Sequence, residues 1–395
     1  MQIAKRIGRL GTEGGFEVLV QVNRLKAEGR DIISFALGEP DFDTPQNIKD
    51  VAIKAIRDGY THYSPSAGIL PLRESIARYV SKTRGIKVHP DEIVVTPGAK
   101  PIFFDSILSC INEGDEVIYP NPGYPIYESV INFVGGKPIP LPLLEEKNFS
   151  FDIEDLQRRI TPRTKMIILN SPHNPTGSIL SYDDLKAIAK IAIQNDLWVL
   201  SDEIYSRIIY DREFQSIISI PEMKERTILL DGFSKTYAMT GWRLGFGVMK
   251  KELAAHIARI ETNADACTAT FTQYAGIEAL EGSQDGALAM VKEFQKRRDI
   301  IHQGLNDIKG VKCLKPHGAF YIYPNVTEVC QNLGLSDSAE LQQYLLHKAG
   351  VAVLARSCFG PRNEGEKEEY IRLSYATSRE NILEGLRRIK KAVEV

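Results

Sequence analysis

The chain has 395 residues, 43% of them hydrophobic and 25% charged, which is ordinary for a globular protein with room for two or more domains. Its formal net charge of −2 gives no reason to expect nucleic acid or an anionic membrane as a partner. Residues 1–10 lack the apolar run of a secretion signal, and no apolar stretch is long enough to span a bilayer. Five scattered cysteines without metal-ligand spacing predict a reduced cytoplasmic protein with no metal site.

Short β-rich runs alternate with helical patterns between about residues 47 and 285. The expected buried strands are brief, rich in Val and Ile, and closed by polar or turn residues: 93–96, 116–119, 166–170, 198–202 and 227–231. Between them lie amphipathic stretches such as residues 183–195. This alternation predicts a mostly parallel sheet covered on both faces, with the reactive residues at the carboxyl ends of its strands.

The chain is expected to form two domains. Residues 47–285 would form the large domain, which contains the alternating strands and helices. Longer charged helices and a few strands, such as 319–323 and 370–374, predict a smaller α+β domain over residues 286–395. Residues 1–46 are expected to pack on that smaller domain.

The first motif that follows a strand is Thr96-Pro-Gly-Ala-Lys-Pro-Ile, which opens a predicted helix. Small residues such as Gly98 and Ala99 at a helix start leave backbone N–H groups free for a phosphate, and the helix dipole assists. Many helices start in this way, so the motif alone is a weak signal. Tyr124, in Asn-Pro-Gly-Tyr-Pro, could stack on an aromatic ring, although simple packing is the commoner role for such a residue.

Polar motifs also follow two later strands. Asn170-Ser-Pro-His-Asn-Pro-Thr-Gly would be a rigid loop that presents the Asn174 amide to a cofactor and a substrate, although turn chemistry alone explains the same residues. Asp202 could pair with the protonated nitrogen of a pyridine ring, or it could simply cap a helix. Tyr205 could reach the phenolic oxygen of such a ring, and Ile204 could supply an apolar face.

The most informative stretch is Asp231-Gly-Phe-Ser-Lys-Thr-Tyr-Ala-Met-Thr-Gly-Trp-Arg-Leu-Gly. Lys235 lies eight positions before Arg243. Gly241 and Gly245 bracket that arginine and would let the backbone approach closely. A desolvated lysine near another cation loses proton affinity and can form a Schiff base, while a guanidinium can clamp a phosphate. The pattern predicts covalently held pyridoxal 5'-phosphate (PLP), and a solvated loop with Lys235 as a surface charge is the alternative.

Arg372 lies on a β-rich segment between Ile371 and Leu373, where a charged side chain usually faces solvent. An arginine that points inward must be paired, and an α-carboxylate is its natural bidentate partner. Gly38, in Leu-Gly-Glu-Pro-Asp-Phe, would let the backbone approach the same carboxylate. A plain turn before Pro40 is the alternative role of this glycine.

With these motifs in order, the chain resembles the class I/II aminotransferases of PLP fold-type I, and more closely the prokaryotic aspartate-aminotransferase type. The similarity runs nearly end to end, from Gly38-Glu-Pro-Asp-Phe through Asn174-Pro-Thr-Gly and Ser234-Lys235 to Arg372-Leu-Ser-Tyr-Ala. It implies an α/β fold in which the large domain has a mostly parallel sheet of the seven-stranded type and the smaller domain is α+β.

The resemblance also implies a role for each site residue. Lys235 would hold PLP as a Schiff base and then move a proton between substrate and cofactor. The other cofactor contacts would be Asp202, Asn174, Tyr205 and Tyr124 at the ring, and Gly98, Ala99, Ser234, Arg243 and Tyr63 at the phosphate. Tyr63 would come from the neighbouring subunit, which implies an isologous homodimer. Arg372, with Asn174 and Gly38, would bind the substrate α-carboxylate.

The implied reaction is ping-pong transfer of the amino group of an L-amino acid, aspartate or glutamate first, to 2-oxoglutarate or oxaloacetate. Donors of the alanine, aromatic or kynurenine type are the alternative within the family. A PLP-dependent β-lyase and a regulatory protein without turnover are the alternatives outside it. The intact set of Lys235, Asp202, Arg243 and Arg372 disfavours a protein without turnover.

Some positions depart from the family pattern or carry uncertain roles. Gly232 stands where many relatives have a phosphate-binding serine, so one phosphate contact would be missing. Lys100 lies where a lysine can read the distal carboxylate of a dicarboxylic substrate, with an ordinary helix-surface lysine as the alternative. Arg356, in Ala-Arg-Ser-Cys-Phe-Gly, replaces a common Pro-Gly and would either read an acidic substrate or face solvent. Residues 14–16 resemble a mobile segment that covers the substrate.

Overall fold

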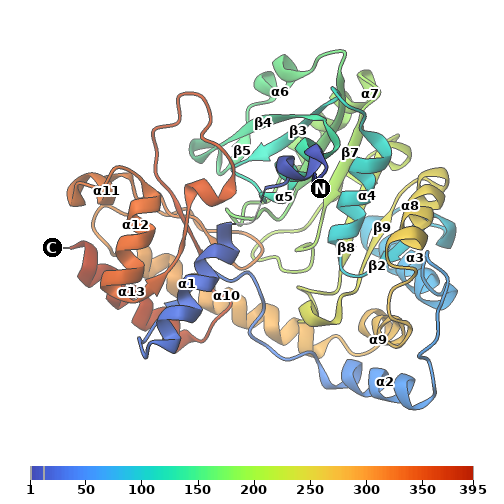
Figure 1. The fold of residues 1–395 in the computed structure, drawn as a ribbon, viewed down its shortest axis with the longest axis horizontal. Coiled ribbons are helices and arrows are strands. Elements are labelled where there is room, and N and C mark those ends of the chain that lie inside the picture. The colour runs from blue at the N-terminus through green and yellow to red at the C-terminus, as the bar shows by residue number, and fades with distance from the viewer. Residues whose placement is uncertain (1, 12–13, 395) are drawn as a thin grey trace.

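Residues 2–11 and 14–394 are described in the computed structural model, and they form an α/β molecule with a larger and a smaller domain (Figure 1). The main sheet contains β2 (Ile93–Thr96), β3 (Glu116–Asn121), β4 (Lys137–Leu144), β5 (Ser150–Phe151), β6 (Thr164–Asn170), β7 (Trp198–Asp202), β8 (Thr227–Gly232) and β9 (Gly245–Val248). Their spatial order is β2-β9-β8-β7-β6-β3-β4-β5.

The main sheet is mostly parallel, as predicted. Strands β4, β3, β6, β7 and β8 run parallel, while β9 is antiparallel to both β8 and β2. The sheet has eight strands in place of the seven-stranded type, since the two-residue β5 pairs antiparallel with the end of β4. The parallel strands place their carboxyl ends at one edge, where the reactive residues were expected.

Of the main-sheet strands longer than two residues, β4 and β9 have no counterpart among the strands expected from the sequence. Prolines at alternate positions of β4 argue against a central strand, because proline lacks a backbone donor. They are tolerated since β4 lies next to the edge and β5 pairs only with Leu143 and Leu144, beyond the prolines. In β9, Gly245 is required by close packing, because a side chain there would collide with the backbone of Gly98 and Ala99.

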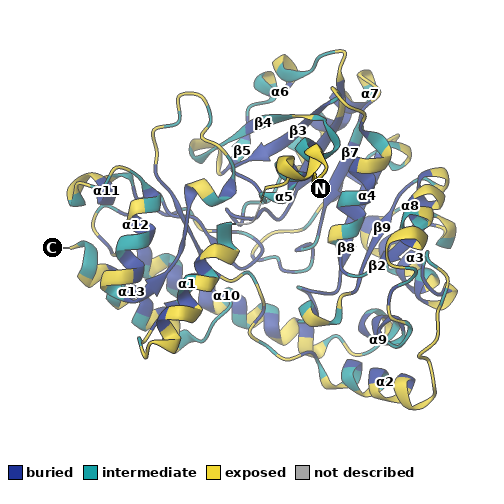
Figure 2. Cartoon of the chain, in the orientation of Figure 1, coloured by how far each residue is buried: buried dark blue, intermediate teal, exposed yellow. Residues whose placement is uncertain are grey.

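Each face of the main sheet is covered by helices, which confirms the predicted layering (Figure 2). Val94 and Leu200 pack in a cluster with side chains of α4 and α8, whereas Ile93 and Val199 point the other way, into clusters with α3 and α7. The helices around this sheet are α2 (Gln46–Arg57), α3 (Leu70–Arg84), α4 (Lys100–Cys110), α5 (Ile126–Val134), α6 (Ile153–Arg159), α7 (Tyr182–Gln194), α8 (Lys251–Ala264) and α9 (Thr270–Glu281).

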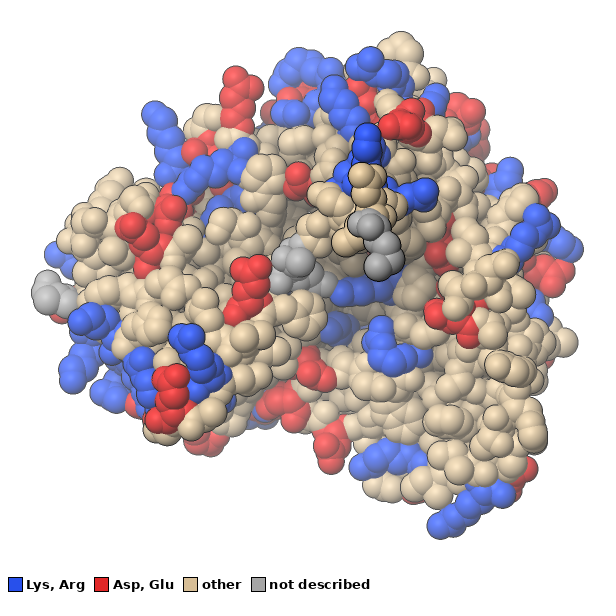
Figure 3. Space-filling model, in the orientation of Figure 1, with Lys and Arg blue, Asp and Glu red and all other residues tan. Residues whose placement is uncertain are grey.

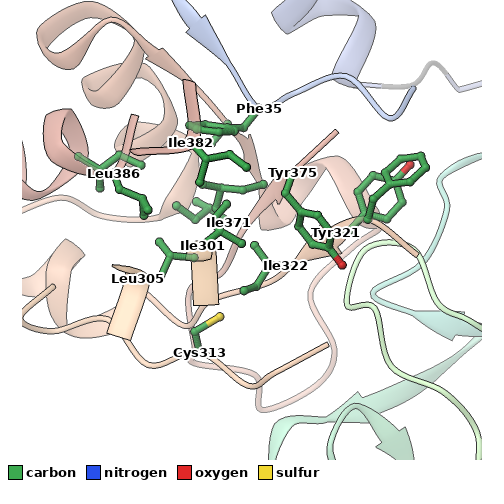
Figure 4. Close-up of a cluster of buried hydrophobic side chains, with 14 of the residues drawn as sticks. Phe35, Ile301, Leu305, Cys313, Tyr321, Ile322, Ile371, Tyr375, Ile382 and Leu386 are labelled. Atoms are coloured by element: carbon green, nitrogen blue, oxygen red, sulfur yellow. The ribbon is translucent and has the colours of Figure 1, made fainter. Parts of the chain in front are cut away.

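The smaller domain has its own sheet and core. Its antiparallel sheet has the order β10 (Tyr321–Ile322), β13 (Ile371–Ser374), β12 (Leu354–Ala355), and β1 (Ile33–Ser34) pairs in parallel with β11 (Val351–Ala352). The helices here are α1 (Gly14–Ala27), α10 (Asp285–Asn306), α11 (Thr327–Leu333), α12 (Ser338–Tyr344) and α13 (Arg379–Val393). Figure 4 shows the buried cluster in which Phe35 joins Ile301, Leu305, Ile382 and Leu386.

The N-terminal residues contact both domains. β1 adds to the smaller domain through β11, and α1 packs on β12. The short helix η1 (Lys5–Arg9) lies instead against α5, where the Gly11 amide donates to Ser129 Oγ at 2.9 Å. The domain boundaries at residues 46 and 285 stay predictions. Among the helices of the described residues, none combines the length and apolar character needed to cross a membrane.

Candidate active site

A cavity of about 390 Å³ opens at the carboxyl ends of the parallel strands, against the smaller domain. It is lined by most of the residues that the sequence pointed to: Gly38, Ala99, Lys100, Tyr124, Asn174, Asp202, Tyr205, Ser234, Lys235, Arg243 and Arg372. Figure 3 shows Lys and Arg side chains within the hollow between the two domains. Gly98 lies directly beneath Arg243, whereas Tyr63 is 89% exposed and does not line this cavity.

Lys235 follows β8 and projects into the cavity. Its Nζ donates to the Gly38 carbonyl oxygen at 2.6 Å, and that bond joins the two domains. Burial lowers the pKa of Lys235 to about 8; the Glu39 charge opposes this, and the positive charges of Arg372, Lys100 and Arg243 add to it. The neutral, nucleophilic form of this lysine is therefore much more populated near neutral pH than that of an ordinary lysine.

Asp202 ends β7 as a buried carboxylate. Its Oδ2 accepts a hydrogen bond from Tyr127 Oη at 2.7 Å, and its Oδ1 accepts one from the Ile204 amide at 3.2 Å. Burial raises the pKa of Asp202 to about 6, although both hydrogen bonds favour the ionised form. Because burial penalises the negative charge of Asp202, a cationic partner would stabilise its ionised form. Tyr127 was not identified from the sequence, although it lies three positions after Tyr124 at the start of α5.

A pair of tyrosines lies between Asp202 and Arg372. Tyr205 Oη and Tyr321 Oη are 2.7 Å apart and buried. Tyr321 is the second site residue that the sequence did not predict, because its surroundings, Ala-Phe-Tyr-Ile-Tyr, indicate a strand and nothing more. A side chain at Gly38 would collide with the Tyr321 hydroxyl, so this glycine is needed for the approach of Tyr321 as well as for the Lys235 bond.

Arg372 points inward and is 5% exposed, so the solvent-facing alternative is wrong. Its Nη1 donates to Asn174 Oδ1 at 3.0 Å, its Nη2 donates to the Ala36 carbonyl oxygen, and its guanidinium lies 4.4 Å from the Tyr321 ring centre. Its buried Nε has no hydrogen-bond partner within residues 2–11 and 14–394. A buried donor that lacks a partner is satisfied best by an anionic ligand.

The start of α4 and Arg243 form the polar end of the cavity. Gly98 has φ +84°, and a side chain there would collide with the Arg243 guanidinium. Arg243 donates to the carbonyl oxygens of Thr240 at 3.0 Å and Pro97 at 3.1 Å, which hold it above the helix N-terminus. This arrangement suits a phosphate. The prediction that Gly241 permits a close backbone approach is wrong, because nothing lies within 4 Å of a side chain placed there.

The positions that depart from the family pattern fall in different places. Lys100 is exposed at the cavity, with its Nζ 5.5 Å from the Tyr124 ring centre. Gly15 and Phe16 of α1 line the cavity. Arg356 is 1% exposed and bonded to Glu366, so both expectations for it, a substrate contact and a solvent-facing side chain, are wrong. Its donors are occupied within the protein because a buried guanidinium must be paired.

Comparisons with known proteins agree with this geometry. The profile of the family "Aminotransferase class I and II" matches residues 30–389. The chain is 41% identical to a probable aspartate/prephenate aminotransferase of Aquifex aeolicus (99% of this chain, 98% of the relative). It is 40% identical to aromatic-amino-acid aminotransferase 2 of Thermococcus litoralis (92% of each). The solved aspartate aminotransferase from Rhizobium meliloti is 34% identical, with a TM-score of 0.94 over 100% of this chain and 99% of that one.

The chain belongs to the class I and II aminotransferase family, and its fold is PLP fold-type I. Members of this family depend on PLP, so the protein is a PLP-dependent aminotransferase. Among the described residues no group of three or more His, Cys, Asp or Glu side chains is arranged to hold a metal ion.

Proposed function

We propose that the cavity holds PLP through the residues assembled there and transfers amino groups from a dicarboxylic amino acid. The residues present fit this cofactor. The buried Asp202 gains a cationic partner in the pyridine nitrogen, and the close pair of Gly98 and Arg243 leaves backbone donors and a guanidinium for the phosphate. Lys235, with its lowered pKa, is the amine for covalent attachment. When bound, PLP supplies an aldehyde for Schiff-base chemistry and a ring that accepts the electron pair left at the substrate Cα.

The remaining chemistry belongs to side chains of this chain. Arg372 and Asn174 bind the substrate α-carboxylate and fix the direction of the Cα–H bond. Lys235 Nζ projects into the cavity and would serve as the base that takes the proton from the substrate Cα and as the acid that returns it. Asp202 would pair with the ring nitrogen, and Tyr205 and Asn174, which line the same cavity, would hold the ring hydroxyl. The observation that supports this assignment most is that Lys235 and the inward-pointing Arg372 line one cavity, with Asn174 bonded to Arg372.

Aspartate and glutamate are our proposed donors. Lys100 supplies a positive charge at the cavity for a distal carboxylate, and relatives at 35–41% identity are named aspartate aminotransferases. Aromatic donors are the second candidate, because Phe16, Leu19 and Leu37 line the same cavity and the Thermococcus litoralis relative is named for aromatic amino acids. Apolar walls favour large apolar side chains, whereas Lys100 favours a carboxylate.

The functional unit that we propose is a cytoplasmic homodimer. Tyr63 is 89% exposed and outside the cavity of its own chain, and we assign it to the phosphate of the partner subunit. All five cysteines are free thiols, which suits a reducing compartment. Sedimentation of the purified protein tests the dimer, and Tyr63→Phe should weaken PLP binding if the assignment is right.

A half-reaction panel tests the proposed substrates. Aspartate, glutamate, alanine, phenylalanine and kynurenine are added singly to the PLP form, and loss of the absorbance of the lysine-bound cofactor is followed, with Lys235→Ala as the blank. Fast conversion by aspartate and glutamate alone supports the dicarboxylate assignment. Equal or faster conversion by alanine or aromatic donors overturns it. Release of pyruvate and ammonia without a 2-oxo acid acceptor would indicate a β-lyase.

A further inference from the structure

Arg356 is a buried arginine whose three nitrogens all donate hydrogen bonds. Its Nε and Nη2 form a two-pronged pair with Glu366 at 2.5 and 2.9 Å. Its Nη1 donates to the Gly360 carbonyl oxygen at 3.1 Å, and Nη2 donates to that of Pro361 at 3.0 Å. The turn from residue 356 to residue 366 is therefore wrapped around one guanidinium.

The same guanidinium reaches across to the main sheet. Arg356 Nη2 lies 3.3 Å from Oδ1 of Asn121, the last residue of β3. Asn121 Nδ2 donates in turn to the Pro361 carbonyl oxygen and to Asn363 Oδ1, both at 2.8 Å. The Gly123 amide donates to the Phe359 carbonyl oxygen at 2.9 Å. The turn is thus fixed to the loop that carries Tyr124.

Both tied segments end in the cavity. Tyr124 lines the cavity from the sheet, and Phe359 lines it from the turn. The Phe359 ring centre lies 5.1 Å from the Arg372 guanidinium. Leu354, two residues before Arg356, stands opposite Arg372 in the pairing of β12 with β13. Arg356 therefore sits behind the wall formed by Phe359 and Arg372, which we call the carboxylate wall.

We propose that Arg356 is a positioning residue that sets the carboxylate wall at its working distance from Tyr124. This inference rests on the proposed role of Arg372 in binding the α-carboxylate. A guanidinium bonded to both sides fixes their separation better than apolar packing does, because its five donors have a rigid planar geometry. Since every donor amino acid carries an α-carboxylate, loss of Arg356 should weaken all donors by the same factor.

The test compares Arg356→Met with Arg298→Met. Arg298 is equally buried in the smaller domain and is paired with Asp211 at 2.7 Å, but it does not line the cavity or bond to the carboxylate wall. Single-turnover half-reactions with aspartate, alanine and phenylalanine give the apparent dissociation constant and the maximal rate for each donor. A misplaced wall should raise the dissociation constant of all three donors about tenfold or more in Arg356→Met. The PLP dissociation constant should stay within about twofold, since no cofactor contact is altered.

The outcomes separate positioning from stability. Both substitutions should lower the melting temperature, but only Arg356→Met should weaken the binding of the donor amino acids. Unchanged donor binding in a folded Arg356→Met protein overturns the inference, and so does weakening confined to aspartate. If Arg356→Met does not fold, Asn121→Ala removes the side-chain bonds from Asn121 to Arg356, Pro361 and Asn363 and keeps the Arg356–Glu366 pair. Normal donor binding in that variant equally overturns the inference. Absence of amino transfer in the unaltered protein would instead refute the proposed function.

Discussion

The side chains at the floor of the cavity are held in place by hydrogen bonds within the protein, whereas those at its mouth are exposed. The floor (Asp202, Tyr205 and Lys235) lies at strand ends, and each of its polar groups has a partner at 2.6–3.2 Å. The mouth (Phe16 and Lys100) is exposed. A floor built before any ligand arrives suits chemistry shared by all substrates, because preorganised groups need no rearrangement during reaction. The mouth is free to differ between relatives that prefer different side chains.

The largest expected effect is at the floor, in Lys235→Ala. Loss of the attachment amine and of the proton carrier should lower the half-reaction rate by at least about 10⁴-fold, the upper end of what proton transfer by one side chain contributes. Rapid mixing with aspartate measures the rate. Lys186→Ala, at an exposed lysine paired with Asp183, is the matched control and should keep full activity. Residual activity above about one per cent in Lys235→Ala would show that the floor does not depend on this amine.

The next effect lies beneath the floor, in Arg84→Met. Arg84 donates to Glu203 at 2.9 Å and to Asp231 at 3.2 Å, and these carboxylates lie beside Asp202 and just before Lys235 in the chain. Removal of one partner from a buried ion pair typically costs about 3–5 kcal/mol. Because burial raises the pKa of Asp231 to about 7, the defect should shrink as the pH falls below 7 and that carboxylate is protonated.

Denaturant unfolding of the PLP-free protein at pH 8 and pH 5.5 measures this defect. Arg78→Met in the same helix is the control, since its exposed pair with Glu281 should contribute less than about 1 kcal/mol. Equal losses of unfolding free energy in Arg84→Met and Arg78→Met would mean that the buried ion pairs of Arg84 stabilise the fold no more than an exposed pair does.

The floor could be found from the sequence more readily than the groups that hold it. Lys235, Asp202 and Asn174 occupy short motifs after strands, and those motifs carry chemical meaning in themselves. Tyr127 and Tyr321 have no such motif, because their partners, Asp202 and Tyr205, lie 75 and 116 residues away in the chain. The burial of Arg356 was not predicted for a related reason: Glu366 is only ten residues away, but the contact that ties Arg356 to the main sheet is with Asn121, 235 residues distant.

Asp202→Asn should separate stability from function at the floor. Burial raises the pKa of Asp202 to about 6 from an ordinary value of 3.8, so the folded state binds the proton more tightly than the unfolded state does. The carboxyl therefore has no effect on stability below about pH 4, destabilises the fold progressively between about pH 4 and 6, and destabilises it by a constant amount above pH 6. At pH 8 the PLP-free variant should be more stable than the unaltered protein by up to about 3 kcal/mol.

When PLP is added, the unaltered protein should become more stable than Asp202→Asn, because only the carboxylate can pair with a protonated ring nitrogen. Thermal unfolding at pH 5 and pH 8, with and without PLP, measures both effects. A variant that is less stable at pH 8 without PLP would mean that the Tyr127 and Ile204 hydrogen bonds outweigh burial of the charge.

The smallest expected effect is at the mouth, in Lys100→Ala. Lys100 Nζ lies over the Tyr124 ring at the exposed end of the cavity, so a bound carboxylate would remain partly hydrated. Charge pairing there should be worth about 1 kcal/mol, or roughly a fivefold loss in kcat/KM for aspartate and glutamate. Alanine and phenylalanine should be unaffected or slightly favoured, since they have no carboxylate to pair. The uniform loss expected for Arg356→Met is the opposite pattern, so the ratio of aspartate to alanine activity distinguishes the mouth from the carboxylate wall.

An equal loss of kcat/KM for all donors in Lys100→Ala would contradict a role in reading the distal carboxylate. It would place this lysine with the cofactor-binding groups, consistent with its contribution to the lowered pKa of Lys235.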